Sequence, residues 1–166
     1  MKITKAELIE MKACEDGLER FINQTGNTGE PVEVLSLIGG ENTLPDLVWL
    51  ASKSLPKERI VRFACDCALI NIEEIKPYTD DYDIIVEFLR NPTGGGLVAY
   101  AIDDAACAAA RVAIYGVAHA AAYAAARAVD VYFDVVQDAV YIHAAHAAHA
   151  AGDEEKVNEL LKEMFA

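Results

Sequence analysis

The stretch Leu97–Ala151 reads LVAYAIDDAACAAARVAIYGVAHAAAYAAARAVDVYFDVVQDAVYIHAAHAAHAA. Alanine is its commonest residue, proline is missing from it, and Gly116 is its only glycine. Alanine has the highest intrinsic helix propensity, and its single methyl group lets two helix backbones approach closely. The stretch therefore predicts tightly packed helices.

Its length predicts that these helices fold back on one another. As one straight helix, its 55 residues would extend about 80 Å at 1.5 Å per residue, which is too long for a compact domain of this size. Breaks are expected at Gly116 and in the β-branched cluster 129–136, where helix propensity weakens. The predicted fold class is all-α: a compact multi-helix bundle with short N-terminal helices and Ala-rich antiparallel C-terminal helices.

Proline and glycine divide the first half of the chain into short helices. Thr4 and Glu7 have the spacing of a capping box at the start of the first helix. Pro31 suits the first turn of a short helical segment that Gly39-Gly40 ends. A third helix is predicted to begin within 42–46 and to end near 55–56, and the central helix is predicted to begin at 57. Another helix is predicted over 82–89, and a last one follows 152 with an apolar stripe over 157–165. Isolated helices this short are marginal in water, so they must pack on one another.

At 166 residues the chain fits one helical domain over 1–166. The sequence Asn91-Pro92-Thr93-Gly94-Gly95-Gly96 is its strongest loop signal, which makes 91–96 the candidate for a subdomain hinge.

The chain is expected to be cytoplasmic, with no membrane partner. Its N-terminus passes directly into an amphipathic helical pattern, which argues against a secretory signal, and charged residues interrupt every apolar stretch before it reaches the roughly 20 residues of a membrane span. The cysteines form no CxxC pair and are too few for a disulfide scaffold, so they are read as small core residues of a reducing compartment. They are Cys14, Cys65, Cys67 and Cys107.

Charge favours a protein partner over a nucleic acid. The 27 acidic and 14 basic residues give a formal net charge of −13, and such a chain repels the phosphates that nucleic-acid-binding proteins neutralise. A protein partner that is basic or binds nucleic acid is therefore expected. The simpler interpretation is that the charge only keeps the protein soluble.

Three histidines near the end of the Ala-rich stretch, His143, His146 and His149, form the most conspicuous candidate for a metal site. Residues three apart share a helix face, so His143 and His146 can ligate one ion, whereas His149 diverges from His143. The structural alternative is that these side chains interact with the dipole at the helix end before Gly152. The structural reading is favoured, and no metal or other cofactor is expected.

Three aspartates at a spacing of four residues, Asp130, Asp134 and Asp138, share one face of a predicted helix. A carboxylate in an apolar helix must face solvent or find a partner. A solvated or ion-paired face is favoured over a paired-carboxylate acid/base site, and this face is the predicted surface for a partner.

No enzyme is predicted, because the chain has no GxSxG, GxGxxG, P-loop or HExxH motif. Cys65 and Cys67 lie on different faces of a helix and cannot cooperate as a CxxC pair does. Trp49 is read as a core residue, with an interface anchor as the alternative.

Three segments resemble a helical family of bacterial and phage immunity proteins. They are 13–21 (ACEDGLERF), 46–50 (DLVWL) and 62–68 (RFACDCA), followed by the Ala-rich block around 118–120. The resemblance spans most of the chain, but its landmarks are structural and none is a catalytic signature. It implies a role in neutralising a toxin or a defence system. The block after Val129 departs from the family pattern, which leaves any shared binding surface open.

The leading hypothesis is a non-enzymatic, acidic interaction protein that binds and inhibits a basic partner, such as a nuclease or defence effector, and is of immunity or anti-defence type. One alternative is a metal-binding helical protein that uses His143 and His146. The other is a homo-oligomer assembled through the Ala-rich helices.

Overall fold

The structure is a computed structural model that describes residues 1–70, 72–78, 80, 82–92, 145, 147–149 and 151–166. This part of the chain is mostly helical with one two-stranded sheet, which confirms the all-α class. The proposed antiparallel helices of 97–144 lie outside the described residues, and so do positions 93–96 of the proposed hinge.

The elements follow one another along the chain with short connections. In order they are β1 Lys2–Ile3, α1 Lys5–Glu10, α2 Glu15–Thr25, β2 Val32–Glu33, the 3-10 helix η1 Val34–Leu37, α3 Leu44–Ser54, α4 Lys57–Leu69, the 3-10 helix η2 Ile72–Tyr78, α5 Tyr82–Arg90 and α9 Glu154–Phe165.

Capping residues explain where α1 and α3 begin. The Thr4 hydroxyl accepts from the Glu7 backbone N–H, and the Glu7 carboxylate accepts from the Thr4 backbone N–H at 2.8 Å, which confirms the predicted capping box. Thr43 and Asp46 form a second box at the start of α3. Each box satisfies backbone donors that the first turn of a helix leaves unpaired.

The segment after Pro31 differs from the expectation. It is not a helix from Pro31 to Leu37: Val32–Glu33 is a strand, and only Val34–Leu37 is a 3-10 helix. Ile3 pairs with Val32 in antiparallel register, and the Val34 N–H donates to the Met1 carbonyl at 3.0 Å. Pairing with the distant N-terminal residues satisfies the backbone in an extended form, so it replaces the local helical bonds.

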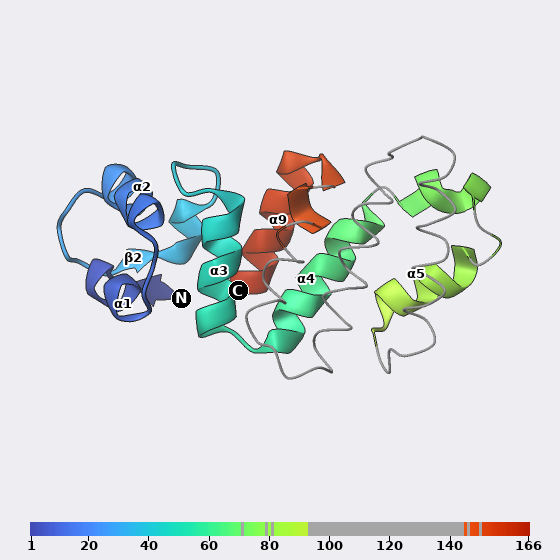
Figure 1. The fold of residues 1–166 in the computed structure, drawn as a ribbon, viewed down its shortest axis with the longest axis horizontal. Helices are drawn as coiled ribbons and strands as arrows, with labels where there is room; N and C mark the ends of the chain where they lie inside the picture. Colours follow the sequence, from blue (N-terminus) through green and yellow to red (C-terminus); the bar gives the residue numbers. More distant parts are fainter. Residues whose placement is uncertain (71, 79, 81, 93–144, 146, 150) are drawn as a thin grey trace.

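Helix α4 is central to the described part of the chain, as predicted from its wide apolar surface. Figure 1 shows α1, α2 and β2 at one end, α5 at the other, and α3, α9 and α4 between them. Helix α4 packs on α3, α5 and α9, while α9 also contacts α3 and η1. The buried side chains of α4 are Ile60, Val61, Phe63, Ala64, Cys65, Cys67 and Ala68.

Two arginines of α4 bind the C-terminal ends of neighbouring helices. Arg59 donates to the Met164 carbonyl of α9 at 2.9 Å, and Arg62 donates to the Arg90 carbonyl of α5 at 2.6 Å. Carbonyls in the last turn of a helix have no partner within it, and they carry the negative end of the helix dipole. The guanidinium groups therefore fix how α5 and α9 dock on α4.

None of the helices in the described part of the chain has the length and apolar character that a membrane span requires.

Candidate functional site

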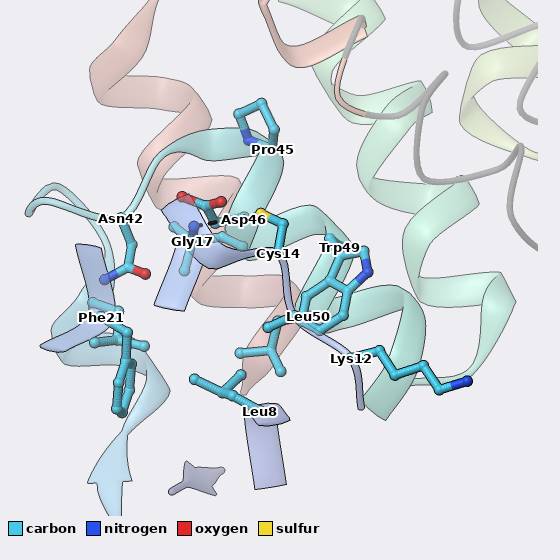
Figure 2. Close-up of a pocket in the computed structure, with 13 residues that line it drawn as sticks. Leu8, Lys12, Cys14, Gly17, Phe21, Asn42, Pro45, Asp46, Trp49 and Leu50 are labelled. Carbon is cyan, nitrogen blue, oxygen red and sulfur yellow. Dashed lines mark hydrogen bonds between the residues drawn. The ribbon is translucent and has the colours of Figure 1, made fainter. Parts of the chain in front are cut away.

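A pocket of about 300 Å³ opens where α1, α2, η1 and α3 meet. Its walls are mainly apolar, and Figure 2 shows side chains from the two N-terminal helices facing those of α3 across it. The large apolar side chains of the lining are Leu8, Phe21, Leu37, Leu47, Trp49 and Leu50. An apolar concavity with a few polar groups is the usual form of a binding site.

The turn between α1 and α2 shapes one side of the pocket. Lys12 adopts a φ of 64°, a left-handed conformation that non-glycine residues rarely take, and the Ala13 N–H bonds back to the Leu8 carbonyl at 2.9 Å. This conformation ends α1 and reverses the chain into α2. It places Lys12, Ala13 and Cys14 in the lining of the pocket.

Gly17 lets α2 and α3 approach closely at the pocket wall. A Cβ atom at this position would lie 3.0 Å from Oδ1 of Asp46 and 3.2 Å from Sγ of Cys14. Both neighbours are held by their own hydrogen bonds, because Cys14 accepts from the Gly17 N–H and Asp46 belongs to the α3 capping box. A residue with a side chain here would therefore require the Asp46 and Cys14 side chains to shift.

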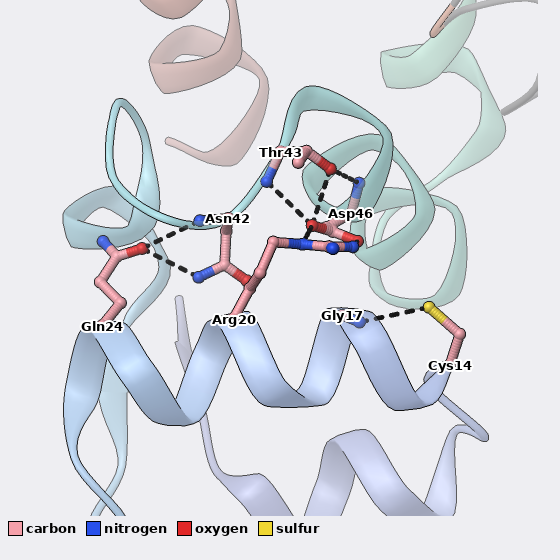
Figure 3. Close-up of polar contacts among 7 residues, drawn as sticks. All are labelled: Cys14, Gly17, Arg20, Gln24, Asn42, Thr43 and Asp46. Carbon is pink, nitrogen blue, oxygen red and sulfur yellow. Dashed lines mark hydrogen bonds and ion pairs between the residues drawn. The ribbon is translucent and has the colours of Figure 1, made fainter.

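An ion pair between Arg20 and Asp46 joins α2 to α3 at the edge of the pocket. Nε and Nη2 of Arg20 each donate to one carboxylate oxygen of Asp46 at 2.8 Å (Figure 3). Oδ2 also accepts from the backbone N–H and the hydroxyl of Thr43. Burial raises the pKa of Asp46, but the hydrogen bonds from Arg20 and Thr43 together outweigh it, so the pKa lies below its ordinary value.

Asn42 is the buried polar residue of the pocket, with 9% of its surface exposed. Its backbone N–H and its Nδ2 both donate to Oε1 of Gln24, at 3.2 and 2.9 Å. Gln24 in turn donates to the Ser36 carbonyl at 2.8 Å, so it ties the loop between η1 and α3 to α2.

The carboxamide oxygen of Asn42 points away from Gln24 (Figure 3). Among the residues that the structure describes, none donates a hydrogen bond to this oxygen. In that part of the chain every fully enclosed side-chain oxygen or nitrogen has a partner, so this oxygen is not fully enclosed. Asn42 therefore contributes to the pocket lining a side chain whose oxygen has no donor among the described residues.

The cysteines divide into two classes. Cys65 and Cys67 are fully buried in α4, as expected for core residues, and burial raises the pKa of Cys65 to about 12. Cys14 is exposed, which corrects the expectation that it belongs to the core: its backbone is extended ahead of α2, and its sulfur caps that helix by accepting from Gly17. Cys107 lies outside the described residues.

Exposed carboxylates also lie on α2, the helix that lines one side of the pocket. Glu15 and Asp16 occupy the first turn of α2, between the lining residues Cys14 and Gly17, and Glu19 follows one turn later. All three are exposed, and no cation pairs with them within the described ranges. They are referred to below as the α2 acidic rim.

None of the site residues predicted from sequence is among the described residues that line this pocket. Asp130, Asp134, Asp138, His143 and His146 lie outside the described residues. His149 is described and is exposed, and it lines a cleft together with Gly152 and Asp153. Where the chain is described, no group of three His, Cys, Asp or Glu side chains is placed to hold a metal ion.

The pocket itself was missed by sequence reasoning. Its residues come from four elements, and each of them reads locally as a core position, a cap or a turn. Only Trp49 carried a signal, as a possible interface anchor, and it is a half-buried wall residue of the pocket.

The arrangement suits binding better than covalent chemistry. Cys14 is a nucleophile at the mouth, but no histidine is among the described lining residues, and the Asp46 carboxylate is already engaged by Arg20 and Thr43. A nucleophile that acts in catalysis needs a base within hydrogen-bonding reach.

Comparison of the chain with protein-family models, with curated proteins and with solved structures found no match.

Proposed function

We propose that this chain is a non-enzymatic binding protein that docks on a basic protein partner through the pocket and its α2 acidic rim. The observation that carries the proposal is an apolar pocket lined in part by α2, a helix whose three exposed carboxylates form no ion pair with the described residues, in a chain of net charge −13. An apolar concavity supplies affinity, while unpaired surface charge steers a partner of opposite sign and fixes its orientation.

The rim is not the only acidic surface. Glu155, Glu159 and Glu163 are exposed at a spacing of four residues on α9, opposite its buried stripe, and the described residues offer them no ion pair either. Like charges at this spacing destabilise a helix slightly. The α2 acidic rim is nevertheless the better docking surface, because α2 also lines the apolar pocket.

The biological role follows from the partner's charge. A protein that binds nucleic acid presents a basic surface, and an acidic protein docked there competes with the phosphates. We propose inhibition of a nuclease, toxin or defence effector, as the resemblance to immunity proteins implies. The proposed location is the cytoplasm, which is the host cytoplasm if the gene belongs to a phage, and the free thiols of Cys14, Cys65 and Cys67 are compatible with that compartment. The proposed fold of the whole chain keeps the Ala-rich segment as antiparallel helices.

The test begins with affinity capture from the native host, or from the infected host if the gene is viral. We expect a basic protein that is retained at low salt and released at high salt, because exposed charges are screened. The captured protein is then purified and recombined with this chain. We expect binding to weaken as salt rises, and the partner's nucleic-acid binding or nuclease activity to fall when the complex forms.

Two variants of equal charge provide the control. One carries Glu15→Gln, Asp16→Asn and Glu19→Gln; the other carries Glu155→Gln, Glu159→Gln and Glu163→Gln. We expect the first to weaken the complex at least about tenfold and the second to leave it nearly unchanged. Salt-insensitive binding, an acidic partner, or equal effects of the two variants would each contradict the proposal. Thermal melts of both variants check that they fold.

A further inference from the structure

We infer that the pocket takes one aromatic side chain of the partner that carries a hydrogen-bond donor, a tyrosine or tryptophan, presented between basic residues. This inference rests on the proposed function for the source of the side chain. The pocket accounts for the bulky aromatic ring, the Asn42 oxygen for the hydrogen-bond donor, and the α2 acidic rim for the basic neighbours.

The size and walls of the pocket set the first requirement. A volume of about 300 Å³ is at the lower end of the range for ligand pockets, so the occupant is a single bulky side chain rather than a folded surface. Leu8 and Leu50 lie near each other in Figure 2, and with Trp49 and Phe21 they belong to an apolar lining. Aromatic side chains that fill such pockets dominate binding at many interfaces.

Asn42 sets the second requirement. Its nitrogen is committed to Gln24, whereas its oxygen has no donor among the described residues. Filling the pocket with a purely apolar group would remove water from this oxygen and leave it unsatisfied, which is unfavourable. A phenol O–H or an indole N–H satisfies it, and neither leucine nor phenylalanine can.

The α2 acidic rim sets the third requirement. Glu15 and Asp16 are exposed chain neighbours of the lining residues Cys14 and Gly17, and the chain as a whole carries a net charge of −13. Cationic flanking residues are therefore favoured, and acidic ones are disfavoured.

Three short peptides separate these requirements. Each is acetylated and amidated: Lys-Tyr-Lys has all three features, Lys-Phe-Lys lacks the donor, and Glu-Tyr-Glu reverses the charge. Trp49 is the only tryptophan of the chain and lines the pocket, so its fluorescence reports occupancy directly. We expect saturable binding of Lys-Tyr-Lys, with at least about fivefold weaker binding of Lys-Phe-Lys and weaker binding again of Glu-Tyr-Glu.

Two variants test the location. In Asn42→Ala the difference between Lys-Tyr-Lys and Lys-Phe-Lys is expected to disappear, because the acceptor is gone. Ala13→Phe is expected to fill the pocket and abolish binding of both peptides, and its matched control, Ala6→Phe, adds the same bulk at an exposed position of α1 and is expected to bind normally. If Asn42→Ala does not fold, the comparison of Ala13→Phe with Ala6→Phe still tests whether the peptides bind in the pocket.

The outcomes also separate the inference from the proposed function. Equal affinity for Lys-Tyr-Lys and Lys-Phe-Lys, no change in Trp49 emission, or normal binding by Ala13→Phe overturns the inference even if a salt-sensitive protein partner is captured. Failure to capture a basic partner, with the peptide preferences intact, overturns the proposed function but supports the pocket's chemistry.

Discussion

At the scale of the residue, environment gives cysteines of one chain different chemistry. Cys65 is enclosed in the centre of α4, where burial raises the pKa of its thiol to about 12. Burial raises the pKa of Cys67 in the same way. Cys14 stands exposed at the start of α2. Because the thiolate is the reactive species, exposure and pKa together decide which thiol reacts.

We predict that iodoacetamide at mildly alkaline pH modifies Cys14 at least about a hundredfold faster than Cys65 or Cys67 in the folded protein. Peptide mapping by mass spectrometry measures each rate separately. In denaturant the three rates are expected to converge, which serves as the control. Fast modification of Cys65 under native conditions would contradict the buried environment described for α4.

At the scale of the element, one carboxylate serves two helices. Asp46 is the N3 residue of α3, where it forms the capping box with Thr43, and it is also the ion-pair partner of Arg20 on α2. Its pKa is lowered in the folded chain, so the ionised form is favoured by folding. The resulting stability is complete above the pKa of an aspartate in the unfolded chain, about 3.9, and is lost as the pH falls through the lower folded-state pKa.

We predict that Asp46→Asn lowers the free energy of unfolding by about 1–3 kcal/mol near neutral pH, because it removes the ion pair and weakens the cap. The difference from the parent chain is expected to shrink as the pH falls below about 4, where the parent carboxyl also becomes neutral. Denaturant unfolding at a series of pH values measures it. Glu159→Gln, at an exposed position of α9, is the matched control, and a pH-independent difference for Asp46→Asn would argue against the ion pair.

At the scale of the molecule, the C-terminal helix joins the described part into one core. Helix α9 packs on α3 and α4, and one continuous cluster of buried side chains includes Ile3 near one end of the chain and Phe165 near the other. Leu161 is 1% exposed within this cluster, whereas its neighbour Leu160 is only partly buried. Loss of the Leu161 side chain therefore leaves a cavity between three helices.

We predict that Leu161→Ala lowers the free energy of unfolding by about 2–5 kcal/mol, and that Leu160→Ala has a clearly smaller effect. Amide hydrogen exchange is expected to show loss of protection in α3 and α4 together with α9, because the three helices share one core. Loss confined to α9 would mean that this helix unfolds as a separate unit.

The sequence by itself determined the helical class, the starts of α1 and α3, the burial of Cys65 and the central place of α4. These features follow from hydrogen bonds three or four residues apart and from the periodicity of apolar side chains, both of which are local.

Only the tertiary structure decided the pairing of Ile3 with Val32, the exposure of Cys14, and the pocket with its open Asn42 oxygen. Each depends on contacts between residues that are far apart in the chain. Val32 is extended because a distant strand satisfies its backbone, and Asn42 is part of a site because Gln24 and Leu8 come to lie beside it. Local patterns specify what an element is, whereas a binding surface depends on which elements meet.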